Sequence, residues 1–257
     1  KQKTAYEIRL SLVGSEMCIR DRTSAGFPKK PYNVELQDAL GNDRKESILG
    51  MPAEADWKLR NPYADKCLMN DFLAYEMFEQ MGNYSSRRRF VEVFVDTGVG
   101  RLSYPGDYIG VEVFLEKIER GNDRVDIAEL TPSHTNEPSI TGGYMFKKDK
   151  DSGGDLNFNA AGQGLKLHEP KPKDMRSALT QNTTTWPGAG YTPSASNQLT
   201  YLVNYLNAFN TAMTAADWKT RTGTNHYSHY IDVDSFVDSH WIVEFPKQID
   251  GYRISNF

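Results

Sequence analysis

Two runs of alternating apolar and polar residues stand out in the first half of the chain. Residues 90–95 read FVEVFV and residues 108–118 read YIGVEVFLEKI, and both are rich in the β-branched and aromatic residues that strands favour. The residues between them are typical of a loop, because they include Gly98, Gly100, Pro105 and Gly106. We therefore predict a β-hairpin with a long connection.

Shorter strands are predicted on either side of this hairpin. Residues 27–36 read FPKKPYNVEL and alternate apolar and polar positions from Tyr32 onward. Two later segments, 142–148 and 164–168, have the length and composition of strands, and residues 149–154 form a polar turn between them.

A first helix is predicted from Asp65 to about Met81. Asp65 suits the N-cap position, and Gly82 is a typical stop signal. The helix carries apolar residues on more than one face, among them Leu68, Phe72, Met69, Leu73 and Met77. We therefore expect the domain to cover most of this helix.

A second helix is predicted to begin at Ser196 or Asn197 and to run to about Met213. Its apolar residues recur every three or four positions, which is typical of one buried helix face. This stripe consists of Leu199, Leu202, Val203, Leu206 and Phe209.

The last predicted helix begins at Asp232 or Asp234, either of which is a suitable N-cap, and Pro246 lies near its end. Its apolar positions are expected to be buried. They are Val233, Phe236, Val237, Trp241 and Phe245.

The remaining segments define the domain organisation. Residues 169–197 are rich in Pro, Thr, Ser and Gly, so we predict an irregular surface excursion. Residues 1–22 lack the clean apolar core and cleavage site of a signal peptide, and they resemble a translated sequencing adapter. The alternative is a genuine amphipathic strand or helix. We assign residues 23–257 to one domain and leave 1–22 out.

These elements predict an α+β fold, in which an antiparallel sheet carries the first helix and the C-terminal part is more helical. Composition supports a folded protein, because 39% of the residues are hydrophobic and 12% are aromatic. A formal net charge of −4 lacks the basic surplus of a nucleic-acid-binding protein. No apolar run approaches the ~20 residues that span a bilayer, and Cys18 and Cys67 provide no disulfide framework.

Several segments together resemble the CotH kinase family, an atypical protein kinase family named for a spore-coat protein. The similarity covers nearly all of residues 23–257 and follows the order of the family's elements. The matching segments are FPKKPYNVEL (27–36), NPYADKCLMNDFLAYEMF (61–78), RFVEVFV (89–95), YIGVEVFLEKIERGNDRVDI (108–127), GGY (142–144), IDVDSFVDSHWIVEF (231–245) and IDGYRISNF (249–257).

The resemblance implies a protein-kinase-like fold and a specific chemistry. The expected reaction is ATP-dependent transfer of phosphate to Ser or Thr of a protein substrate rich in these residues, with Mg²⁺ or Mn²⁺. The resemblance also implies a bacterial protein of the spore coat, the cell surface or the extracellular space, although the residues themselves do not reveal the compartment. Neither a nucleic-acid partner nor a membrane span is expected.

Phosphoryl transfer needs a cation on the phosphates and an acid that holds this cation. The resemblance makes Lys29 and Lys30 the candidate cations. Because neighbouring side chains of a strand point to opposite faces, only one of them can face the nucleotide, and we favour Lys30. Glu76 of the first helix is the candidate partner, with Glu79 as a rival. A surface charge on the helix is the alternative for either.

Asp250, in the segment IDGYR, is the candidate catalytic aspartate, and an ordinary Asp-Gly turn is the alternative. Protein kinases place a metal-binding Asn five residues after this Asp. Ser255 and Asn256, five and six residues on, are therefore the candidate metal ligands. Glu116 ends the central hairpin and is a candidate nucleotide contact. A salt bridge at the end of a strand is the alternative.

The sequence departs from the family pattern in three places. The family has an Arg-Gly-x-Ser stretch before its Pro-Lys-Lys strand, where this chain reads Thr-Ser-Ala-Gly at residues 23–26, and it often has Arg at the position of Asn70. After Asp-Gly-Tyr-Arg the family continues to a Trp-Asp-x-Asp motif that binds metal, whereas this chain ends at Phe257. We therefore expect the chain to be truncated and to have little activity alone.

Other functions are weighed against the kinase. The fold is also compatible with a non-catalytic surface or coat protein that assembles with partners, and Trp186 and Tyr191 are candidates for carbohydrate recognition. His226 and His229 lie three residues apart beside tyrosines, which by itself is a weak sign of a metal site. A plain polar turn is favoured over a calcium loop, because no glutamate closes the set formed by Asp149, Asp151 and Asp155.

Overall fold

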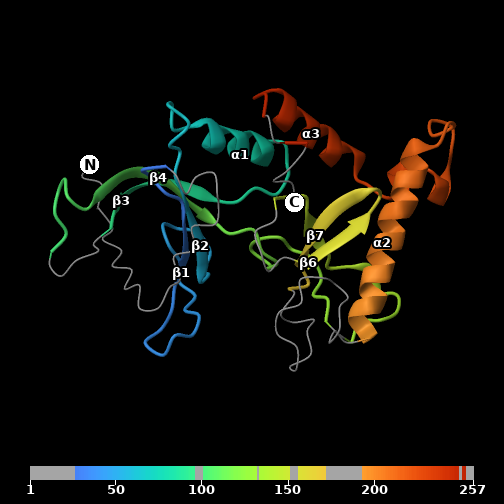
Figure 1. Cartoon of the computed structure of the whole chain (residues 1–257), viewed down its shortest axis with the longest axis horizontal. Coiled ribbons are helices and arrows are strands. Elements are labelled where there is room, and N and C mark those ends of the chain that lie inside the picture. Colours follow the sequence, from blue (N-terminus) through green and yellow to red (C-terminus); the bar gives the residue numbers. More distant parts are fainter. Residues whose placement is uncertain are drawn as a thin grey trace. The chain divides into compact units, whose positions relative to one another are not determined.

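The computed structural model describes residues 27–95, 101–131, 133–150, 156–171, 193–248 and 251–252 (Figure 1). The chain divides into two compact units, whereas the sequence predicts one domain for residues 23–257. The first unit comprises residues 1–76 and 85–118, and the second comprises residues 77–84 and 119–257. In the described part of the chain, no helix combines the length and the apolar character needed to cross a membrane.

The first unit is built on a four-stranded antiparallel sheet (Figure 1). Its strand order is β1-β2-β4-β3, with β1 at Tyr32–Glu35, β2 at Asp56–Arg60, β3 at Arg88–Phe94 and β4 at Tyr108–Glu116. The predicted central hairpin is confirmed as the pair β3 and β4. The strand predicted at residues 27–36 is shorter than expected, and β2 was not predicted.

The register of β4 sorts the residues of this sheet onto two faces, because residues directly opposite each other in paired strands point to the same side. One face carries Trp57 opposite Glu116 and Leu59 opposite Phe114. The core on this face also includes Val34, Ile48 and Met51. Trp57 and Phe114 stack with ring centroids 5.0 Å apart.

The opposite face of the sheet carries α1, at Asn70–Gln80. Phe72 of α1 stacks on Phe90 of β3 at a centroid distance of 4.5 Å. Phe90 lies opposite Val113, and Arg88 lies opposite Leu115, so all four residues share this face. The first helix therefore packs on the sheet, as the sequence predicts.

The N-terminus and the burial of α1 differ from the prediction. The helix begins at Asn70 instead of Asp65, because Leu68 has a φ of 59°, which no right-handed helix contains. Asp65 still binds this segment, since its carboxylate accepts from the backbone N–H groups of Cys67 and Asn70. Gly82 follows the helix with a φ of 90°, as a glycine stop requires. The expectation that the domain covers the helix is wrong, because α1 has no fully buried residue.

The second unit contains a three-stranded antiparallel sheet and α2 (Figure 1). The order is β5-β7-β6, with β5 at Met145–Lys147, β6 at Leu156–Ala160, β7 at Gln163–Glu169 and α2 at Pro193–Thr214. The predicted strands correspond to β5 and β7, and β6 was not predicted. The predicted α2 stripe packs on one face of this sheet, and the cluster includes Leu156, Phe158, Leu165, Leu167, Leu199, Leu202, Val203 and Leu206.

Two further features of α2 follow from its sequence. The helix begins at Pro193, three residues before the predicted start, and proline suits a first turn because its missing N–H needs no partner there. Gln198 is fully buried and donates its side-chain amide to the backbone oxygens of Thr131 and His134, at 2.8 Å each. This side chain joins the helix to the loop that precedes β5. Among the described residues of this unit, 3₁₀ turns lie at Ser139–Thr141, Gly223–Asn225 and Tyr227–His229.

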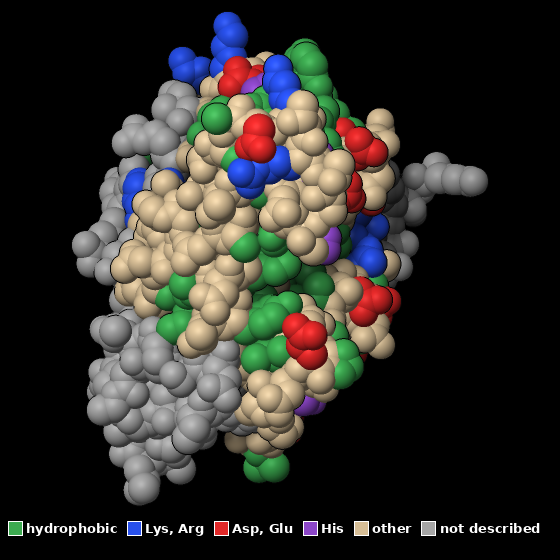
Figure 2. Space-filling model, turned by 90° about the vertical axis from the view of Figure 1, so that its right-hand side faces the viewer, with side chains coloured by type: hydrophobic (Ala, Val, Ile, Leu, Met, Phe, Trp, Pro, Cys, Tyr) green, Lys and Arg blue, Asp and Glu red, His purple; other side chains and the backbone are tan. Residues whose placement is uncertain are grey.

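The last helix, α3, runs from Val233 to Glu244, and Asp232 is its N-cap, as one of the two predicted alternatives. The burial predicted for its apolar positions is wrong. Phe236 is 53% exposed, Trp241 is 55% exposed and Phe245 is 70% exposed, whereas Val243 is buried. Figure 2, which views the side of the chain that carries α2, shows hydrophobic side chains at the surface among polar ones. Apolar spacing predicts the face of a helix, but it does not show what covers that face.

The core of the second unit generates a stability prediction. Leu156 is 0% exposed, so Leu156→Ala removes buried methyl groups and leaves a cavity, which is expected to cost about 3 kcal/mol of unfolding free energy. Leu40 is 87% exposed, and Leu40→Ala is expected to cost less than about 0.5 kcal/mol. Urea unfolding followed by circular dichroism measures both. Equal losses in the two variants would contradict the assignment of the core.

Candidate functional site

The loop before β1 brings Lys29 against the middle of the sheet. The strand begins only at Tyr32, so Lys29 and Lys30 both precede it, and strand alternation does not decide between them. The side-chain amide of Asn61, the residue after β2, donates to the backbone oxygen of Lys29. The Nζ of Lys29 in turn donates to the backbone oxygen of Val111. Lys29 is therefore held at both its backbone and its ammonium group.

The sequence favours Lys30 as the cation that holds phosphate. In the structure, however, the neighbouring Lys29 is the lysine whose position is fixed by hydrogen bonds. Lys30 is half-buried, and none of the hydrogen bonds and ion pairs found among the described residues involves it. Burial lowers the pKa of Lys29 below its usual value, and the nearby charge of Glu112 opposes this shift. We therefore take Lys29 as the candidate cation of this site.

Glu112 is a site residue that the sequence analysis does not single out. It lies in β4 opposite Val91 and is 0% exposed. Neither of its two carboxylate oxygens has a hydrogen-bond donor among the described residues. Burial raises the pKa of Glu112 to about 7, because the charged form loses its hydration, while Lys29 acts in the opposite direction.

The backbone of β4 is irregular at this point. The register shifts between Val93 and Phe94, which lie opposite Gly110 and Tyr108, so Ile109 is an extra residue in the ladder. Gly110 has a φ of 105°, and a Cβ added to it would lie 3.4 Å from the Nζ of Lys29. Glycine therefore permits the close approach of the lysine. Burial and the charge of Glu112 also raise the pKa of Tyr32, the first residue of β1.

Glu76, the predicted partner of the lysine, lies elsewhere. Its carboxylate accepts from Nη2 of Arg88 at 2.6 Å. The guanidinium of Arg88 also lies over the rings of Phe72 and Tyr75, at 5.0 and 5.7 Å. Arg88 and Phe90 belong to the face that carries α1, whereas Glu112 belongs to the other face. The structure does not bring Glu76 and Lys29 together.

Glu116, the predicted nucleotide contact, takes part in a salt bridge. Its side chain is buried, and its two oxygens accept from the backbone N–H of Arg87 at 3.0 Å and from Nη1 of the same residue at 2.8 Å. The next residue, Lys117, pairs with Asp56 of β2 at 3.0 Å. These contacts match the alternative of a salt-bridged strand end.

The predicted catalytic and metal-binding residues lie outside the described part of the chain. They are Asp250, Ser255 and Asn256. Trp186, Tyr191, Asp151 and Asp155 also lie outside it. The two described residues after Asp250 contact α3. A Cβ on Gly251 would lie 2.6 Å from Val243, and the hydroxyl of Tyr252 bonds with Nδ1 of His240 at 2.5 Å.

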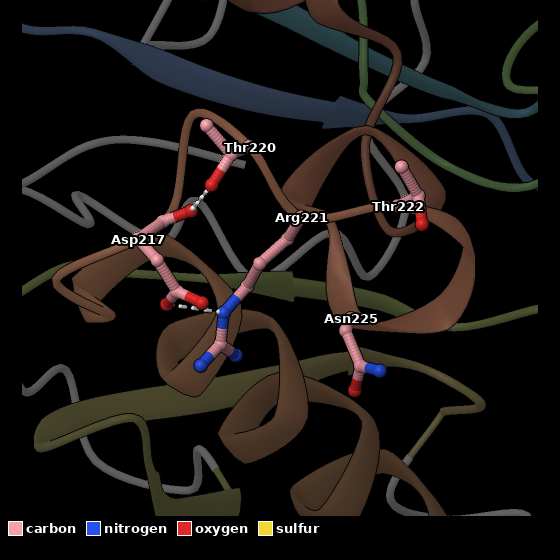
Figure 3. A pocket seen from close by; sticks show the side chains of 5 residues that line it. All are labelled: Asp217, Thr220, Arg221, Thr222 and Asn225. Atoms are coloured by element: carbon pink, nitrogen blue, oxygen red, sulfur yellow. Dashed lines mark hydrogen bonds and ion pairs between the residues drawn. The ribbon is translucent and has the colours of Figure 1, made fainter.

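The second unit contains a polar pocket of about 340 Å³ (Figure 3). It is lined by Asp217, Thr220, Arg221, Thr222 and Asn225. Nε of Arg221 donates to Asp217 at 2.7 Å, and this hydrogen bond lowers the pKa of the Asp217 carboxyl. The pocket therefore offers an already neutralised charge pair, which is a poor site for an ionic ligand.

The histidines near this pocket are engaged locally. Nδ1 of His226 bonds with the hydroxyl of Ser228 at 2.6 Å. Within the described residues, no group of three or more His, Cys, Asp or Glu side chains could hold a metal ion. Among the predicted site residues that the structure describes, Lys29 lies near an acid that was not predicted, Glu112.

Two signals in the sequence point to the residues that were missed. Glu112 lies between Gly110 and Phe114 on one face of β4 and interrupts the apolar run of this strand, which marks it as a buried acid. Arg88 alternates with Phe90 in β3, which places a cation on the face that α1 covers. Both signals require the register of the sheet, which the sequence alone does not supply.

Comparison with known proteins gives one match. A family model described as "CotH kinase protein" matches residues 18–257, which is most of the chain. Neither the curated proteins nor the solved structures contain a match.

The contact between Glu76 and Arg88 predicts a loss of stability on substitution. The side chain of Arg88 is 2% exposed and that of Glu76 is 44% exposed. Glu76→Gln leaves a buried guanidinium without its carboxylate, which is expected to cost about 1–2 kcal/mol, since solvent reaches the pair from one side. Glu92→Gln, on the same strand as Arg88 and exposed, is the control and is expected to change stability by less than about 0.5 kcal/mol. An unaltered midpoint in urea for Glu76→Gln would refute the role of the pair.

The pKa of Glu112 predicts how stability depends on pH. A carboxyl whose pKa rises from 4.5 to about 7 on folding binds its proton more tightly in the folded state. The stability that this group contributes is therefore present at low pH and is lost as pH rises from about 4.5 through 7. Relative to Glu112→Gln, the wild-type chain is expected to lose about 3 kcal/mol of unfolding free energy across this range. A difference between the two proteins that stays constant with pH would rule out the shift.

Proposed function

The chain belongs to the CotH kinase family, and on that premise we propose that it is a kinase domain for the ATP- and metal-dependent phosphorylation of Ser or Thr of a protein substrate. The observation that carries the proposal is the position of Lys29. Its ammonium lies against the backbone of Gly110 and Val111, and a carboxyl group lies on the next residue of the strand. A cation held on an antiparallel sheet in this way suits the phosphates of a nucleotide.

The residues at this position fit a phosphate group. Lysine has three N–H donors, and Val111 accepts one of those of Lys29. Gly110 has no side chain between the strand and the ammonium, so the backbone can approach a ligand closely. In this proposal Lys29 holds phosphate and Lys30 is the alternative cation.

The remaining roles belong to the segment after α3. Asp250 is proposed to accept the proton of the substrate hydroxyl. The hydroxyl of Ser255 and the amide of Asn256 offer oxygen atoms, which Mg²⁺ and Mn²⁺ prefer as ligands. A divalent cation bound there would neutralise the charge that develops on the transferred phosphate. The proposed substrate is a protein rich in Ser and Thr.

Nucleotide binding and phosphate transfer test different parts of the proposal. The chain is expected to bind MgATP in isothermal titration calorimetry, and Lys29→Met is expected to weaken binding by roughly tenfold or more, since a charge-assisted hydrogen bond is lost. Lys30→Met is the matched comparison and is expected to have a smaller effect. In a protein that joins this chain to the family's Trp-Asp-x-Asp segment, Asp250→Asn is expected to retain binding and to lower transfer of labelled γ-phosphate to casein by roughly 100-fold or more.

The possible outcomes separate the functions that the fold allows. Binding of MgATP together with transfer that EDTA abolishes supports the kinase. Binding without transfer to Ser-rich acceptors, in the protein that also carries the Trp-Asp-x-Asp segment, favours a non-catalytic protein that keeps the nucleotide site. The absence of ATP binding with either Mg²⁺ or Mn²⁺ contradicts the proposal.

A further inference from the structure

The carboxyl group of Glu112 is enclosed in the first unit although no group in the described part of the chain donates a hydrogen bond to it. Buried carboxyl groups are almost always hydrogen-bonded or paired, because removing them from water is costly. A buried carboxyl in the middle of β4 is therefore expected to have a partner or a function. A partner would lie among the neighbours of Glu112 on its own face of the sheet.

Those neighbours are mostly apolar. Val91 lies directly opposite Glu112, and Gly110 and Phe114 flank it along β4 on the same face. The charge of Lys29 acts on Glu112, and the charge of Glu112 acts on Lys29 and Tyr32. Arg89, opposite Phe114, is a second cation on this face, but its Nη1 donates to the backbone oxygen of Arg88. Lys29 is therefore the cation that we expect to pair with an ionised Glu112.

The ammonium of Lys29 is already close to the required position. It donates to the backbone oxygen of Val111, the residue next to Glu112. It also lies in the direction in which a Cβ of Gly110 would point, at 3.4 Å. The lysine is thus held by Gly110 and Val111, the two residues on the N-terminal side of Glu112.

The alternative acid, Glu76, is separated from Lys29 by the sheet itself. Glu76 pairs with Arg88, which lies on the face that α1 covers. Moving Glu76 to Lys29 would break this ion pair and leave the guanidinium of Arg88 buried without its carboxylate. Pairing Lys29 with Glu112 of β4 therefore requires less rearrangement of the structure than pairing it with Glu76 of α1.

We propose that Glu112 is the positioning residue for Lys29, and that its carboxylate pairs with the ammonium and fixes it for binding a nucleotide phosphate. The proposal rests on the proposed kinase function for its ligand, but the pairing itself can be measured without nucleotide. The charge of Glu112 favours the protonated form of Lys29 and so offsets part of the effect of burial. In return, the ammonium favours the ionised form of Glu112.

Competitive acylation of lysines by acetic anhydride, read by mass spectrometry of the Lys29 peptide, tests the pairing. The reagent modifies the neutral amine, so a lower pKa gives faster labelling at mildly alkaline pH. Glu112→Gln is expected to speed the labelling of Lys29 about threefold or more, which corresponds to a fall of about half a pKa unit. Glu112→Asp is expected to restore slow labelling, and Glu76→Gln is expected to leave Lys29 labelling unchanged.

Addition of MgATP tests the role of the pair in binding. In the wild-type chain MgATP is expected to protect Lys29, and in Glu112→Gln the concentration needed for half protection is expected to rise about tenfold. Equal protection in both proteins overturns the positioning role and leaves the proposed function intact. A wild-type Lys29 that MgATP does not protect counts against the nucleotide site and hence against both.

A second variant, Lys29→Met, tests the pairing even if Glu112→Gln does not fold. Infrared difference spectra follow the C=O band of the protonated Glu112 carboxyl as pH is raised. Lys29→Met removes the cation, so the band is expected to persist to higher pH than in the wild-type chain. A band that disappears at the same pH in both proteins, or Lys29 labelling that Glu76→Gln accelerates and Glu112→Gln does not, refutes the pairing of Lys29 with Glu112.

Discussion

The register of β4 is the constraint on which the first unit depends. This strand bonds to β2 on one side and to β3 on the other, so its alternation assigns each neighbour to a face. Phe114 stacks on Trp57 on one face, while Val113 and Leu115 lie on the face that α1 covers. A shift of one residue would exchange the faces, exposing the aromatic core to α1 and placing Glu112 among the contacts of the helix.

Three buried charges around this strand are accommodated in different ways. The guanidinium of Arg88 lies over the rings of Phe72 and Tyr75, and its Nη2 donates to the carboxylate of Glu76. Glu116 accepts from the backbone and the guanidinium of Arg87. Glu112 has a nearby cation, but none of the described residues donates a hydrogen bond to it. Its pKa is raised because burial removes the charged form from water. The contrast separates the two structural ion pairs from a group that is available for function.

The sequence predicts those parts of the fold that local patterns determine. The hairpin of β3 and β4, the stripe of α2 and the cap at Asp232 all follow from periodicity or capping. The strand β2 escapes prediction because DWKLR contains only two apolar residues, and its place depends on pairing with β4. Family resemblance identifies the region of Lys29, but the choice between two adjacent lysines depended on the hydrogen bonds of Lys29 with Asn61 and Val111. The partner acid depended on which face of the sheet each carboxylate occupies.

The place where β2 ends connects the fold to the proposed chemistry. Arg60, the last residue of β2, lies opposite Val113, so the backbone of Val111 extends past the final pair. An unpaired carbonyl at this position needs a donor, and the ammonium of Lys29 supplies one. The same contact places a cation beside Gly110 without the entropy cost of ordering a free lysine at the moment of binding. In the proposed site Lys29 has two tasks, because its ammonium donates to the sheet and holds the phosphate. That proposal also gives the buried acid beside it a role, which the packing of the sheet does not.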